Sequence, residues 1–79
     1  MGAIVPLVLS GLKLIMTNLP AFTALGIDLV EVFDRSKAIV TGDTTSTPAE
    51  REAALAEIVS MEAQRDARLE ELRLLAPNS

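Results

Sequence analysis

Apolar residues fill the first third of the chain almost without interruption, from Met1 to Ile27, and Lys13 is the one formally charged side chain among them. A single polar line crosses this segment at helical spacing, formed by Ser10, Lys13 and Thr17. Pro6 lies near the start, where a helix tolerates proline because its first N–H groups have no intrahelical partner. The pattern predicts an N-terminal helix over residues 1–20 that is apolar on every other face.

The sequence Asn18-Leu19-Pro20 interrupts this helix. Proline disfavours the helical conformation of the residue before it, and its ring clashes with the carbonyl four residues back. Two alternatives stay open at this point: the helix breaks at Pro20, or it continues with a kink.

Residues 21–40 change to a one-sided pattern. Asp28, Glu31 and Arg35 mark a polar face, and Glu31 precedes Arg35 by four residues, the order that favours an ion pair on a helix. The apolar face follows the spacing of an amphipathic helix over about 24–40. Its members are Leu25, Leu29, Val32, Phe33, Ile39 and Val40.

A polar loop over residues 41–47 ends this helix, and we expect Gly42 to adopt the left-handed conformation that terminates many helices. Thr47 is placed to cap the next helix, and Glu50, three residues later, completes a capping box. The next helix is therefore predicted to begin at Pro48, since proline is favoured at the first helical position.

The last predicted helix, 48–75, is followed by a tail over 76–79 and carries a thin apolar stripe that Glu62 and Arg65 interrupt at its middle. Its short connection to the preceding helix predicts an antiparallel hairpin. We expect the hairpin contact to come from Leu55, Ile58, Leu69 and Leu72.

These elements predict an all-α fold: a kinked or broken apolar helix, then a hairpin of about 24–40 and 48–75. At 1.5 Å per residue the hairpin helices are about 26 and about 42 Å long, so the second overshoots the first. Unless the N-terminal helix folds back, this overhang and the apolar helix both stay uncovered, and such surface indicates an interface. We expect neighbouring copies to cover the apolar helix. The predicted interface residues are Leu7, Leu14, Ile15, Leu25, Leu29, Val32 and Phe33.

Composition strengthens the expectation of self-association. A chain of 79 residues forms at most one small domain, and it has no Cys to stabilise it by disulfides or thiolate metal sites. Hydrophobic residues make up 49% but aromatics only 3%, which suits an aliphatic helical core. The net charge of −4 disfavours nucleic acid, whose phosphates require clustered Lys and Arg.

Candidate chemistry is sparse. The chain has no His, Cys, Tyr or Trp, which removes the usual general bases and soft metal ligands. Its four glycines form neither a dinucleotide fingerprint nor a phosphate-binding loop. We therefore predict no catalytic, cofactor-binding or metal-binding residue and no enzymatic activity.

Membrane insertion is the alternative for the apolar segment. A membrane span needs about 20 predominantly apolar residues, and the window 2–21 offers them only with Lys13 near its middle. A central lysine costs about 2.5–3.5 kcal/mol on insertion scales, which the many Leu, Ile and Val side chains offset. Whether lipid or protein covers this segment stays open.

The motifs Gly26-Ile27-Asp28-Leu29, Val40-Thr41-Gly42-Asp43 and Thr47-Pro48-Ala49-Glu50-Arg51 follow one another in an order that resembles small bacteriophage late-gene proteins. The resemblance covers about residues 24–75 and implies a virion or phage-accessory role, without transferring any functional residue. Phage holins are similar in size and in their apolar start, but this chain departs from them in its acidic end.

The leading hypothesis is a non-enzymatic structural or interaction protein, a homo-oligomer or part of a larger assembly such as a phage particle, in the virion or host cytoplasm. The alternative is a holin-like protein or membrane anchor of the inner membrane, with residues 2–27 inserted.

Overall fold

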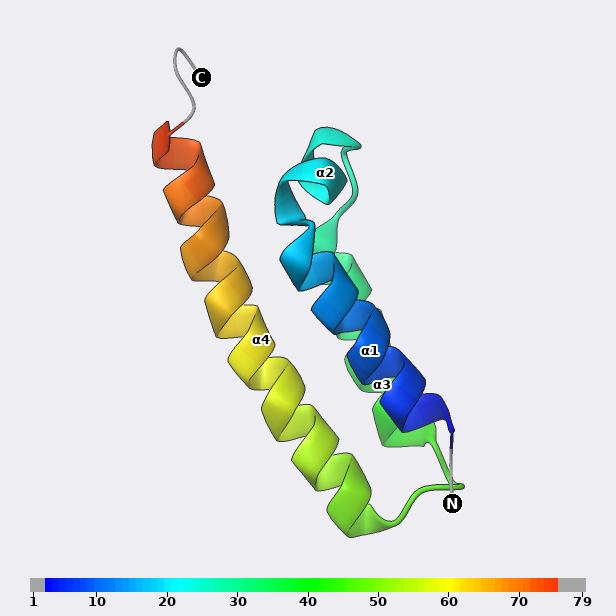
Figure 1. Cartoon of the computed structure of the whole chain (residues 1–79). Helices are drawn as coiled ribbons and strands as arrows, with labels where there is room; N and C mark the ends of the chain where they lie inside the picture. The colour runs from blue at the N-terminus through cyan, green and yellow to red at the C-terminus, as the bar shows by residue number, and fades with distance from the viewer. Residues whose placement is uncertain (1–2, 76–79) are drawn as a thin grey trace.

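The computed structural model describes residues 3–75, and the two residues before them and the predicted tail over 76–79 lie outside the described part. The described range contains helices and no strand, so the all-α prediction is confirmed. The helices are α1 (Ile4–Thr17), α2 (Leu19–Ala24), α3 (Leu29–Gly42) and α4 (Pro48–Leu75). Figure 1 shows α1 and α3 side by side, with α4 running along both.

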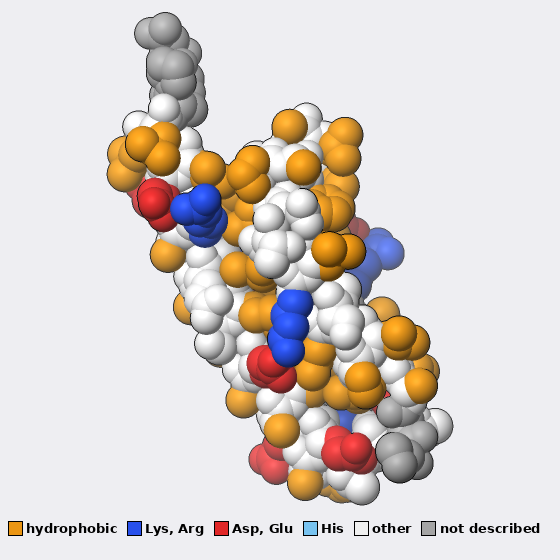
Figure 2. All heavy atoms as spheres, viewed as in Figure 1, with side chains coloured by type: hydrophobic (Ala, Val, Ile, Leu, Met, Phe, Trp, Pro, Cys, Tyr) orange, Lys and Arg blue, Asp and Glu red, His pale blue; other side chains and the backbone are white. Residues whose placement is uncertain are grey.

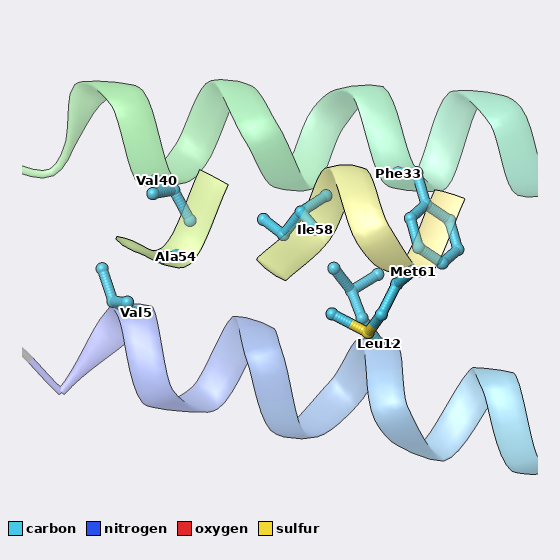
Figure 3. Packing of buried hydrophobic residues seen from close by; sticks show 7 residues of the cluster. All are labelled: Val5, Leu12, Phe33, Val40, Ala54, Ile58 and Met61. Atoms are coloured by element: carbon cyan, nitrogen blue, oxygen red, sulfur yellow. The ribbon is translucent and has the colours of Figure 1, made fainter. Parts of the chain in front are cut away.

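The N-terminal helix folds back onto its own chain. The start of α1 lies beside the end of α3, and both helices pack against α4 (Figure 1). Figure 3 shows the shared core, to which all three helices contribute: Val5, Leu12, Phe33, Val40, Ala54, Ile58 and Met61. Val5 and Leu12 are thus covered by α3 and α4 of the same chain. The expectation that only neighbouring copies could cover the N-terminal helix is therefore wrong for its inner face.

The chain between α1 and α2 changes direction at Asn18. The Leu14 carbonyl accepts hydrogen bonds from Thr17 Oγ1 at 2.8 Å and from Asn18 Nδ2 at 2.9 Å, so side chains satisfy a carbonyl in the last turn of α1. Pro20 is the second residue of α2, where a helix needs no N–H donor. α2 then packs against α4, so Leu69 and Leu72 at the predicted overhang are half-buried.

Gly26 forms the turn that returns the chain towards α3. Its φ of 76° is left-handed, and its N–H and that of Ile27 donate to the carbonyls of Thr23 and Phe22, at 3.0 and 3.3 Å. This pair of hydrogen bonds is the Schellman motif, which ends many helices at a glycine. The predicted start at residue 24 is therefore too early, because the turn separates α2 from α3.

Asp28 begins α3 by capping it. Its Oδ1 accepts a hydrogen bond from the Glu31 backbone N–H at 3.1 Å, which satisfies one of the unpaired donors of the first turn. The acid that the sequence pattern placed on a helix face is thus the residue that starts the helix. On the exposed side of α3, Glu31 and Arg35 form the expected i, i+4 ion pair at 2.7 Å.

The predicted capping box at the start of α4 is confirmed. The Thr47 backbone N–H donates to Glu50 Oε1 at 2.7 Å, and the Glu50 N–H donates to Thr47 Oγ1 at 3.1 Å. The hydrogen bond from the Thr47 backbone is the first cause that lowers the pKa of Glu50, because it favours the charged carboxylate. α4 begins at Pro48, as the sequence predicts.

Asp43, rather than Gly42, organises the loop between α3 and α4. Gly42 is the last residue of α3, and Gly26 is the glycine with a positive φ among the described residues, so the left-handed assignment to Gly42 is wrong. The buried Asp43 side chain accepts from the hydroxyl and backbone N–H of Thr45, which lowers its pKa. Arg51 Nη1 donates to the carbonyls of Asp43 and Ser46 at 2.7 and 2.6 Å, tying the loop to α4.

Charged residues join α3 and α4 where the apolar stripe of α4 is interrupted. Arg65 is buried, with its guanidinium 4.9 Å from the centre of the Phe33 ring and 2.8 Å from Asp66. Lys37 Nζ of α3 donates to Glu62 Oε1 at 3.1 Å, and this hydrogen bond is the main cause that raises the pKa of Lys37. The two residues that interrupt the stripe therefore take part in the contact between these helices, beside its apolar core.

Candidate interaction surface

An exposed apolar strip remains on α1 after its own chain has covered the inner face. Ile4, Leu7 and Leu14 are exposed by 44, 68 and 62%, and Gly11 lies between the two leucines. Spacings of three, four and three residues place these four positions within an arc of about 80°. We call Ile4, Leu7, Gly11 and Leu14 the outer face of α1.

The outer face is turned away from α4. Lys13, on another side of α1, forms an ion pair with Glu57 of α4 at 3.0 Å and so marks the side that α4 covers. The outer face therefore lies on the side nearer to α3, where Ile39 is also half-exposed. Figure 2 shows exposed hydrophobic side chains over the region where Figure 1 places α1.

Nothing charged lies on the outer face, because Lys13 is the one formal charge in α1 and it pairs elsewhere. Gly11 leaves a gap between its large neighbours, since a Cβ added there meets no atom within 4 Å. An uncharged strip of large side chains with one gap can contact a second helix closely. It offers no group for acid–base or nucleophilic chemistry.

The structure divides the sequence-predicted interface residues into three groups. Leu7, Leu14 and Leu25 are exposed and accessible to another molecule. Ile15 and Val32 are partly buried against the core. Leu29 and Phe33 are buried in their own chain, so the isolated chain does not present them to another molecule.

The predicted hairpin residues lie along the side of α4 that faces the other helices. Ile58 is buried in the core, and Leu55 packs partly against it. Leu69 and Leu72 are half-buried in the part of α4 that runs along α2. Ala54 and Met61, which share the apolar stripe, and Arg65, which interrupts it, are buried on the same side.

Ile4 and Gly11 were not among the interface residues predicted from the sequence. A signal for them was present, because positions 4, 7, 11 and 14 follow the alternating three- and four-residue spacing of a helix–helix contact. That spacing did not stand out in a segment that is apolar nearly all round, where the polar line of Ser10, Lys13 and Thr17 is the more visible pattern. The apolar residues of α1 can be divided into inner and outer ones only once the face that packs against α3 and α4 is known.

Other surfaces of the described part offer less. A shallow depression on the outside of α3 is lined by charged residues around Val30 and Ala38, namely Asp28, Glu31, Asp34 and Arg35. Within residues 3–75, no group of three or more His, Cys, Asp or Glu residues is arranged to hold a metal ion. None of the helices in that range combines the length and hydropathy that crossing a membrane requires.

Comparison with protein families, curated proteins and solved structures finds no match to this chain. The resemblance to bacteriophage late-gene proteins therefore stays a prediction, and the candidate site depends on the geometry of the chain alone.

Proposed function

We propose that this chain is a non-enzymatic interaction protein that self-assembles, or docks on a larger assembly, through the outer face of α1. In this proposal the hairpin of α3 and α4 is the support, and α1 lies on it as the interaction helix. The observation that carries the proposal is the exposure of Leu7 and Leu14 on a helix whose inner face is already covered.

The energetic argument concerns large apolar side chains left in water. Burying a leucine side chain fully contributes about 1.5–3 kcal/mol, and both leucines are more than half exposed in the single chain. Contiguous exposed apolar surface of this kind marks sites of protein contact in many proteins. The absence of charge on the outer face removes the desolvation cost that an ion would add.

The proposal predicts that aspartate on the outer face breaks the assembly without unfolding the chain. We would compare wild type with Leu7→Asp and Leu14→Asp by size exclusion with light scattering, detected by refractive index because the chain has no Trp or Tyr. The wild type should have a multiple of the 8.4 kDa chain mass, and each variant should have the mass of one chain.

Ser10→Asp is the matched control, since Ser10 is exposed on the same helix but belongs to the polar line. It should leave the mass unchanged. Leu29 is unsuitable for this test, because it is buried and an aspartate there would disrupt the fold. A wild type that stays a single chain up to millimolar concentration would contradict self-assembly.

A further inference from the structure

The outer face of α1 has a spacing that reads the same in both directions. Ile4, Leu7, Gly11 and Leu14 are separated by three, four and three residues. When a second α1 runs antiparallel, position 4 meets 14 and position 7 meets 11, and the same pairs recur by symmetry. Antiparallel pairing of two identical helices requires this match between each position and its partner position.

Size as well as spacing matches in this arrangement. Leu7 of one copy meets Gly11 of the other, so a large side chain enters the gap that glycine leaves, and this happens twice. Ile4 meets Leu14 at both ends. Antiparallel helices pack closely when a large residue faces a small one.

Gly11 has no evident purpose inside the single chain. It lies in a helix, where glycine is less favourable than alanine by about 1 kcal/mol. No atom lies within 4 Å of the position that a Cβ would occupy, so neither α3 nor α4 requires its small size. Its φ is not positive either, since that conformation belongs to Gly26 among the described glycines.

The charge distribution of the chain leaves α1 free for contact with a second copy. Each copy has a net charge of −4, with its acids on α3, α4 and the loops, and none on α1. Among the described helices longer than two turns, α1 is the one without Asp or Glu. Pairing through α1 therefore brings no carboxylate of that helix into the contact. A partner with a charged contact face would have to bury that charge without a counter-ion on this side.

We propose that the occupant of the outer face is a second copy of this chain, whose α1 packs antiparallel with Leu7 of each copy over Gly11 of the other. This proposal rests on the proposed function and specifies its partner and geometry. α1 is about 21 Å long, so the contact lies at the small end of specific interfaces. We expect a dimer that forms in the micromolar to millimolar range.

Disulfide crosslinking tests the direction of pairing, on a sequence that contains no cysteine of its own. In the antiparallel pair, residue 4 of one copy lies beside residue 14 of the other, whereas two residues 14 lie about 15 Å apart along the helix axis. A disulfide needs Cα atoms within about 7 Å. A mixture of Ile4→Cys and Leu14→Cys chains should therefore crosslink at least tenfold more than either variant alone.

Gly11→Gln tests the gap itself. Glutamine forms helices better than glycine and meets nothing in the single chain, so the melting temperature of the monomer should stay the same or rise. In the dimer the same side chain occupies the space of Leu7 from the other copy, and the Kd should rise at least tenfold. Ser10→Gln, at the adjacent position on the polar line, should leave the Kd unchanged.

These outcomes separate the inference from the proposed function. If Leu7→Asp breaks an oligomer but each cysteine variant crosslinks with itself, the assembly is parallel and only the antiparallel inference is overturned. If Leu7→Asp leaves the mass unchanged, both fail. A chain that stays monomeric and sediments with phosphatidylcholine vesicles through Leu7 and Leu14 would assign the outer face to lipid and overturn the inference.

Discussion

At the scale of single residues, the turn between α2 and α3 depends on one glycine. Gly26 has a left-handed φ of 76° and closes α2 with two backbone hydrogen bonds, while Gly42 is an ordinary helical residue at the end of α3. An L-residue in the left-handed region costs about 1–2 kcal/mol because its Cβ approaches the carbonyl oxygen. The two glycines therefore differ in how they tolerate a side chain.

We predict that Gly26→Ala destabilises the fold by about 1 kcal/mol, which lowers the melting temperature by about 4–8 °C for a chain of this size. Gly42→Ala should leave the melting temperature unchanged or slightly raised, since a Cβ there meets no atom within 4 Å. Thermal unfolding followed by circular dichroism compares the two. Equal losses in both variants would show that the turn at Gly26 is not the cause.

Arg65 is the residue whose burial is least expected from its chemistry. Its guanidinium stacks on Phe33, and Nη1 is buried without a hydrogen-bond partner among the described residues. A buried donor without a partner costs free energy, while the stack on the ring stabilises the charge. The aliphatic part of the side chain also fills space between α3 and α4.

We predict opposite results for two replacements of Arg65. Arg65→Ala removes the stack and leaves a cavity, and it should reduce the free energy of unfolding by about 2 kcal/mol. Arg65→Met keeps most of the volume without the unpaired donor, so it should be neutral or stabilising. Urea denaturation at equilibrium gives both values, and a methionine variant as unstable as the alanine variant would assign the role of Arg65 to its charge.

At the scale of elements, hydrogen bonds from side chains close in sequence fix where α3 and α4 begin. The capping box of Thr47 and Glu50 could be predicted because it depends on residues three apart in sequence. Periodicity predicts Asp28 on the polar face of a helix, whereas the structure has it as the cap, because periodicity does not show that Gly26 turns the chain just before it. Periodicity alone could not show whether Asp28 lies on a helix face or caps the helix, so it could not give the start of α3.

The capping box makes stability depend on pH in a definite direction. The pKa of Glu50 is lowered in the folded chain, so its contribution is complete above the ordinary carboxyl range and is lost as the pH falls through the folded pKa. Asp43 contributes in the same direction. The melting temperature should therefore be level from about pH 7 to 5 and decline below the ordinary values of 4.5 and 3.8.

Glu50→Gln separates the hydrogen bond from the charge. Glutamine keeps the reciprocal bond of the capping box but does not titrate, so the decline in acid should be smaller while stability at pH 7 changes little. Thr47→Ala removes the cap itself and should cost about 1 kcal/mol at pH 7. Melting curves between pH 3 and 7 test this, and an acid decline as large in Glu50→Gln as in wild type would assign it to other carboxylates.

At the scale of the whole molecule, the sequence predicted the helices better than their arrangement. The helix over 24–40 and the helix over 48–75 have one apolar side each, so their contact follows from amphipathicity. The N-terminal helix is apolar nearly all round, and no periodicity tells which side packs inward. Val5 and Leu12 are buried because both α3 and α4 pack against this side of α1, and that packing leaves Leu7 and Leu14 outside.

Assembly through the outer face would also couple stability to concentration. A partner that binds only the folded chain stabilises it by about 2.7 kcal/mol at a hundred times its Kd, and for a chain of this size that raises the melting temperature by about 10 °C or more. We therefore predict that the melting temperature of the wild type rises with protein concentration from micromolar to millimolar. Leu7→Asp, which keeps Val5 and Leu12 in the core, should melt at one temperature throughout, and Ser10→Asp should follow the wild type. A wild type whose melting temperature is independent of concentration would mean that the folded chain gains no stability from its own copies.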